Sequence, residues 1–74
     1  MINRRMLLVA QLADAERSII ESEVRIGRQK QCIAEQARAG HDSAIAKELL
    51  DMLQGSHALH VAARERIKVG LSSL

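Results

Sequence analysis

Residues 39–43 read Ala39-Gly40-His41-Asp42-Ser43, and this stretch decides the fold. Gly40 suits the left-handed backbone conformation that commonly follows the last turn of a helix. Asp42 or Ser43 suits the N-cap of a second helix, because either side chain can accept a hydrogen bond from a free backbone amide. We therefore expect one helix to end at about residue 39 and another to begin at about residue 43.

Outward from this break, the chain contains no proline and is rich in helix-forming residues. Gly27 and Gly55 each cost about 1 kcal/mol relative to alanine inside a helix, so they are weak points and not helix ends. The pattern predicts helices over about 3–39 and 43–70, with a turn at 40–42. Helices joined by so short a turn are antiparallel neighbours. The predicted fold is an all-α, coiled-coil-like hairpin of two antiparallel helices, forming one domain over residues 1–74.

A seven-residue repeat indicates which faces meet. In the first helix the repeating positions are Leu12, Ile19, Ile26 and Ile33, with Ala15, Ser22, Gln29 and Gln36 between them. In the second helix they are Ala46, Leu53, His60 and Ile67, with Leu49, Ser56, Ala63 and Gly70 between them. Such a repeat is typical of helices that supercoil around one another. Folding the chain at residue 41 places Ser22 opposite His60.

The composition favours association with a partner. The chain has 74 residues without Phe, Trp or Tyr, and its lone Cys32 excludes a disulfide framework and points weakly to a reducing compartment. Chains of this size commonly need disulfides, metal or oligomerisation to be stable. We expect a homodimer that forms a four-helix bundle, with a larger assembly or a heterologous protein partner as the alternatives. The candidate partner face consists of Ile20, Val24, Leu50 and Leu59.

The polar residues near the centre of the repeat predict a cluster between the helices, formed by Ser22, Glu23, His60 and Arg64. Ser22 leaves room for the His60 ring, while Glu23 and Arg64 are near enough to hydrogen bond with it. Polar groups between helices can fix the register of pairing. A histidine beside a carboxylate could also respond to pH near neutrality.

The sequence predicts no catalytic, cofactor-binding or metal-binding residues, so we expect a protein that is not an enzyme. His57 and His60 have a spacing that helical metal sites use, but a third ligand would have to come from Glu21, Glu23 or Cys32, and Cys32 lies several turns away. A packed, hydrogen-bonded His60 with His57 at the edge of the contact is the favoured interpretation. Cys32 lacks the positioned base and oxyanion site that nucleophilic catalysis requires.

Charge leaves one alternative function open, which is binding of RNA or DNA. The formal net charge is +2, and the first half holds the basic excess, including Arg25, Arg28 and Lys30. Acidic residues are interspersed at salt-bridge spacing, as in Asp14 and Arg17, and aromatic residues for base stacking are missing. A solvated, salt-bridged face is therefore the favoured interpretation.

No membrane partner is expected, because no segment approaches the roughly 20 apolar residues of a membrane span. Residues 6–10 form an apolar run after two arginines. This run is shorter than the roughly 7–15 residues of a signal-peptide core. We expect a cytoplasmic protein.

A wider pattern covers about residues 11–68, and its residues are Leu12, Ala15, Ile19, Glu23, Ile26, Gln29, Ile33, Gly40, His41, Asp42, Ala46, Leu49, Leu50, Leu53, Leu59, His60, Arg64 and Ile67. This pattern resembles that of a group of small uncharacterised proteins from rhizobia and related alphaproteobacteria. Ser22, where the group would have glycine, and Gln36, where it would have an apolar residue, depart from it. The resemblance implies a bacterial helical hairpin and carries no activity.

Overall fold

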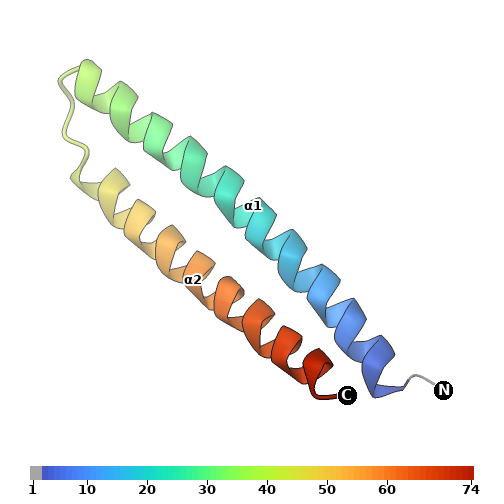
Figure 1. The fold of residues 1–74 in the computed structure, drawn as a ribbon. Coiled ribbons are helices and arrows are strands. Elements are labelled where there is room, and N and C mark those ends of the chain that lie inside the picture. Colours follow the sequence, from blue (N-terminus) through green and yellow to red (C-terminus); the bar gives the residue numbers. More distant parts are fainter. Residues whose placement is uncertain (1–2) are drawn as a thin grey trace.

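Two long helices make up the fold (Figure 1). The computed structural model describes residues 3–74, with α1 over Arg4–Arg38 and α2 over Ala44–Ser72. The helices run antiparallel, so the start of α1 and the end of α2 lie at the same end of the molecule (Figure 1). The predicted all-helical hairpin is confirmed, and its helix bounds lie within two residues of those expected. The first two residues of the predicted domain lie outside the described residues.

The end of α1 has the geometry that its sequence predicts. Gly40 adopts a positive φ of 76°, which glycine tolerates without a steric penalty. The amide of His41 donates to the carbonyl of Gln36 at 2.9 Å, and the amide of Gly40 donates to the carbonyl of Ala37 at 3.1 Å. These two bonds form a Schellman motif, which satisfies carbonyls that the helix itself leaves free.

The start of α2 is capped by Asp42. Its Oδ1 accepts a hydrogen bond from the amide of Ala44 at 2.9 Å. Ser43 occupies the N-cap position, but its side chain makes no capping bond. Of the two residues that the sequence offered for this role, the structure selects the aspartate.

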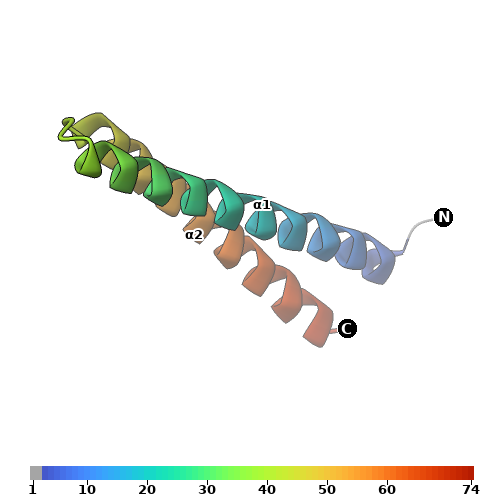
Figure 2. The same cartoon turned by 90° about the horizontal axis from the view of Figure 1, so that it is seen from above.

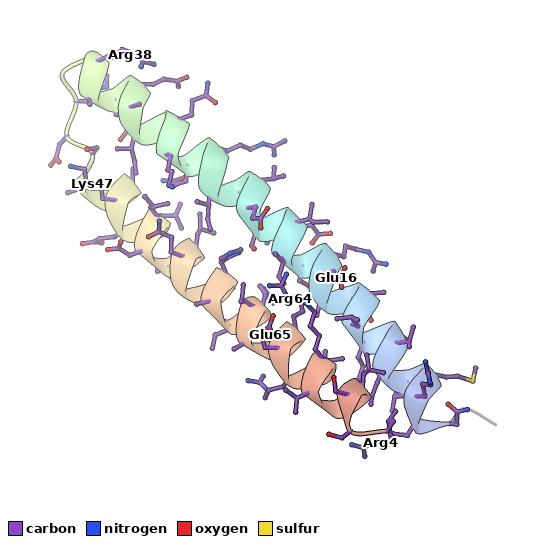
Figure 3. All side chains as sticks on the ribbon, viewed as in Figure 1. Arg4, Glu16, Arg38, Lys47, Arg64 and Glu65 are labelled. Atoms are coloured by element: carbon purple, nitrogen blue, oxygen red, sulfur yellow. The ribbon has the colours of Figure 1, made fainter. Side chains whose placement is uncertain are left out.

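The connection between the helices shifts their pairing by about one turn. It runs back alongside the end of α1 before α2 begins (Figure 1), and Lys47 in the first turn of α2 lies well below Arg38 (Figure 3). Ser22 consequently lies against His57 and not, as predicted, against His60. The prediction failed because it treated the turn as a symmetrical fold about residue 41.

The face of α2 that meets α1 also differs in part from the prediction. The repeat Ala46, Leu53, His60 and Ile67 is half-buried as expected. The positions between them that face α1 are Leu50, His57, Arg64 and Leu71, all half-buried. The predicted Leu49 and Ser56 are exposed, whereas Ala63 and Gly70 are half-buried. On α1 all eight predicted contact positions are buried or half-buried.

The hairpin has very little interior. Its Cα atoms span 58 × 15 × 15 Å, and the two helices cross at a shallow angle (Figure 2). Among residues 3–74, Ile19 is the one apolar residue that is buried, with 5% of its surface exposed. Within the same residues, neither helix has a stretch that is long and apolar enough to cross a membrane. A single helix-to-helix contact therefore supplies all of the apolar packing.

Candidate functional site

A polar pair lies at the middle of the contact between the helices. Ser22 of α1 is 6% exposed, and its Oγ lies 2.6 Å from Nδ1 of His57 on α2. The same Oγ lies 2.8 Å from the backbone carbonyl of Ile19, to which it donates. The histidine is half-buried.

The hydrogen bonds of this pair assign the position of one proton. A serine hydroxyl has a single proton, and here it points to the carbonyl of Ile19. With that proton used, the tautomer of His57 that satisfies the short contact carries its proton on Nδ1 and donates it to Ser22 Oγ. In this tautomer the ring nitrogen nearest Ser22 donates to the hydroxyl oxygen and does not accept its proton. The pair is suited to holding the helices in register.

The predicted cluster of Ser22, Glu23, His60 and Arg64 is not formed as expected. Ser22 is at the contact, but its partner is His57 because α2 is shifted by about one turn. The side chain of Glu23 is exposed and makes no hydrogen bond or ion pair within residues 3–74.

Arg64 is turned to a neighbour on its own helix. Its Nε lies 3.2 Å from Oε1 of Glu65, which Lys68 also approaches at 3.9 Å. Figure 3 shows Arg64 and Glu65 on α2 at the level of Glu16 of α1. Glu23 and His60 therefore do not form the carboxylate–histidine contact that a pH response would require.

Two glutamines extend the polar character of the contact towards the connection. Gln29 Nε2 donates to the backbone carbonyl of Ala46 at 2.9 Å, which links the helices a second time. Gln36 has a buried Oε1 without a hydrogen-bond partner in the described part of the chain. Cys32 is a half-buried free thiol beside this face.

A row of exposed apolar side chains follows the outside of α2. Ile45, Leu49, Met52 and Leu59 are all exposed, with Ile45 at 83% and Leu59 at 72%. Together with the exposed Ser56 and the half-buried Ala63 they form what we call the outer α2 stripe. Each member directly precedes a residue that faces α1, so the stripe is turned about 100° from the contact.

The outside of α1 has its own, weaker apolar face. Ile20 and Val24 are exposed, as is Val9 nearer the N-terminus. Ile20 directly follows the buried Ile19, whereas members of the outer α2 stripe precede the contact positions. In an antiparallel pair of helices, the position after a contact residue on α1 and the position before a contact residue on α2 lie on opposite sides. The hairpin therefore has one apolar face on each side.

The predicted partner face is therefore split. Ile20, Val24 and Leu59 are exposed, but Ile20 and Val24 lie on the opposite side from Leu59. Leu50 is half-buried and faces α1, so the prediction that it belongs to a free surface is wrong. Its neighbour Leu49 is the residue that the outer stripe presents.

The charged residues of α1 form no continuous basic surface. The expected pair of Asp14 and Arg17 is present, with Oδ1 and Nη1 3.1 Å apart. Arg25, Arg28 and Lys30 make no ion pair within residues 3–74, and the exposed Glu21 lies one turn before Arg25.

Residues 3–74 enclose no pocket, and no three of their His, Cys, Asp and Glu side chains come close enough together to hold a metal ion.

No family model, curated protein or solved structure matches the chain. The resemblance to the small rhizobial proteins thus stays a prediction. What the geometry offers is a register-fixing polar contact and two apolar faces.

Proposed function

We propose that this chain is a small, non-enzymatic protein–protein interaction module that acts as a helical-hairpin dimer. The observation that supports this most is the row of large apolar side chains on the outside of α2, which α1 does not cover. Recognition between helices requires only such anchors at helical spacing. The two apolar faces lie on opposite sides, so a dimer formed through one face leaves the other for a heterologous partner.

The surface area of the hairpin supports the need for a partner. Residues of the single chain expose 5623 Å², whereas a compact folded protein of 8.2 kDa exposes about 4,500 Å². Large exposed apolar patches on small proteins commonly mark interaction sites. A second chain that covers one face would bring the exposed surface towards the usual value.

Light scattering across a dilution series tests the proposal. We expect a mass of twice 8.2 kDa at high concentration and a decrease on dilution. The thermal midpoint should rise with protein concentration, because association stabilises the folded state by mass action. A well-folded chain that stays monomeric up to millimolar concentration would contradict the proposal.

Binding of RNA or DNA is the second candidate function. It rests on Arg25, Arg28 and Lys30, whose side chains make no ion pair within the described residues. Gel-shift assays at two salt concentrations separate it from protein binding, since phosphate contacts weaken steeply with salt. If no shift occurs even at low salt, this candidate is removed.

A further inference from the structure

We propose that the dimer partner is a second copy of this chain, and that the two copies pack antiparallel through the outer α2 stripe. This inference rests on the proposed function and adds the contacting face, the direction of packing and the residues that meet.

The spacing of the outer α2 stripe is that of a second coiled-coil contact. Its members follow one another at intervals of four and three residues, from Ile45 to Ala63. This is the repeat that helices use to interlock side chains over several turns. The α1 contact uses the residues one position later, so both contacts can form on α2 at once.

The stripe is complementary to itself when two copies run in opposite directions. A two-fold axis near residue 54 pairs Ile45 with Ala63, Met52 with Ser56, and Leu49 with Leu59 of the second copy. In the first two pairs a large side chain meets a small one, which lets helices approach closely. Parallel packing would instead place each residue against its own copy, with Ile45 against Ile45 and Ala63 against Ala63.

Charges at the two ends of the stripe favour the same direction. One further step of three residues along α2 leads to Arg66, and Asp42 lies at the other end of the stripe, two residues before α2 begins. Antiparallel packing brings Asp42 of each copy to Arg66 of the other, whereas parallel packing brings like charges together. Arg66 makes no ion pair within residues 3–74 of its own chain. Asp42 uses Oδ1 to cap α2, which leaves its other carboxylate oxygen for this contact.

The area available agrees with a dimer interface. The hairpin exposes 5623 Å², which is roughly 1,100 Å² more than a compact protein of its mass exposes. A standard protein–protein interface takes about 800 Å² from each partner. Ile45, Met52 and Leu59 are the most exposed large apolar residues of α2, so covering them would remove much of the excess.

Two matched variants of the full chain test the face. Leu59→Glu places a charge in the outer α2 stripe, and Ile20→Glu places the same charge on the opposite side of the hairpin. Both side chains are mostly exposed, so circular dichroism should show unchanged helix content. By light scattering we expect Leu59→Glu to weaken the dimer at least about a hundredfold, because each copy loses a buried leucine contact. Ile20→Glu should leave the dissociation constant within about threefold, because exposed surface changes have small effects.

Disulfide cross-linking tests the direction. In a Cys32→Ser background, chains carrying Ile45→Cys are mixed with chains carrying Ala63→Cys under mild oxidation. Antiparallel packing predicts a cross-link in the mixture and none in either variant alone. The two copies of residue 45 would then be separated by 18 positions along the axis, or about 27 Å, far beyond the reach of a disulfide.

The possible outcomes separate this inference from the proposed function. Cross-linking of each variant with itself would show parallel packing and overturn the inference. A dimer that Ile20→Glu dissolves and Leu59→Glu leaves intact would also overturn it, while the proposal of a dimeric module would stand. A wild-type monomer at all concentrations would remove both.

Discussion

Ser22 and His57 lie 35 positions apart in the sequence, and their side chains meet at 2.6 Å between α1 and α2. Around them the contact is mostly aliphatic, and aliphatic side chains at a seven-residue repeat tolerate slippage by a turn. Sliding α2 by one turn, about 5.4 Å, would break this bond. In one direction it would bring His60 opposite Ser22, which is the pairing that the sequence predicts. We infer that the pair selects one register out of several that the apolar residues alone would allow.

A double-mutant cycle measures this relationship. Ser22→Ala and His57→Ala are made singly and together, and their free energies of unfolding are measured in urea by circular dichroism. We expect a coupling energy of about 1 kcal/mol between the two positions, the usual value for a partly buried hydrogen bond. Ser22→Ala alone should destabilise the chain because it leaves Nδ1–H of His57 unpaired.

The matched control is a second cycle, made with Ser22→Ala and His60→Ala. His60 lies at a contact position one turn along α2 but makes no hydrogen bond to Ser22 among residues 3–74. We expect a coupling energy near zero for this pair. A larger coupling with His60 than with His57 would restore the register that the symmetrical fold about residue 41 predicts.

Two glycines should respond in opposite ways to the same substitution. Gly27 lies inside α1, and a Cβ added there meets no atom within 4 Å. Gly27→Ala should therefore stabilise the chain by about 1 kcal/mol, the difference in helix propensity. Gly40 has a positive φ of 76°, so Gly40→Ala should destabilise it by about 1–2 kcal/mol. Urea midpoints at one fixed protein concentration check both, and equal effects of the same sign would contradict the assigned geometry.

The capping of α2 predicts that Asp42 contributes more to stability than Ser43, although Ser43 occupies the N-cap position. Ser43 is at the N-cap, yet Asp42 makes the bond to the amide of Ala44. Asp42→Ala should lower the free energy of unfolding by about 1 kcal/mol, while Ser43→Ala should change it little. Asp42→Asn retains an oxygen acceptor and should preserve most of this stability. The same variant loses the charge and should weaken the dimer, which dilution in light scattering detects separately.

The sequence was sufficient to predict the two helices and the break between them. Gly40 and the run of helix formers on either side act locally, so their effect can be read without knowing the partner surface. The face of α1 was also predictable, because Leu12, Ile19, Ile26 and Ile33 recur every seven residues. Ile19 at the centre of that repeat is the one buried apolar residue among residues 3–74.

The site was less predictable because α2 carries two adjacent apolar stripes. Leu49 and Leu50 both fit a contact with α1, and so do Ser56 and His57. Polarity alone favours a contact that leaves out His57 and Arg64, but both are half-buried in the structure. The bond from His57 to Ser22 and the aliphatic stem of Arg64 make this acceptable. The pairing could not be derived either, since it depends on the path of residues 40–43.

Gln36 should be a position where the chain can be made more stable. Its Oε1 is buried without a hydrogen-bond partner in the described residues, and burial of an unpaired acceptor costs free energy. Gln36→Leu removes the acceptor and keeps a similar size, so we expect the free energy of unfolding to rise by about 1 kcal/mol. Gln29→Leu is the matched control, because Gln29 already bonds to the carbonyl of Ala46 and its loss should bring no such gain. Both are measured in urea at the same protein concentration, since dimerisation would otherwise shift the midpoints. A loss of stability in Gln36→Leu, with helix content unchanged, would mean that the amide oxygen is paired in solution.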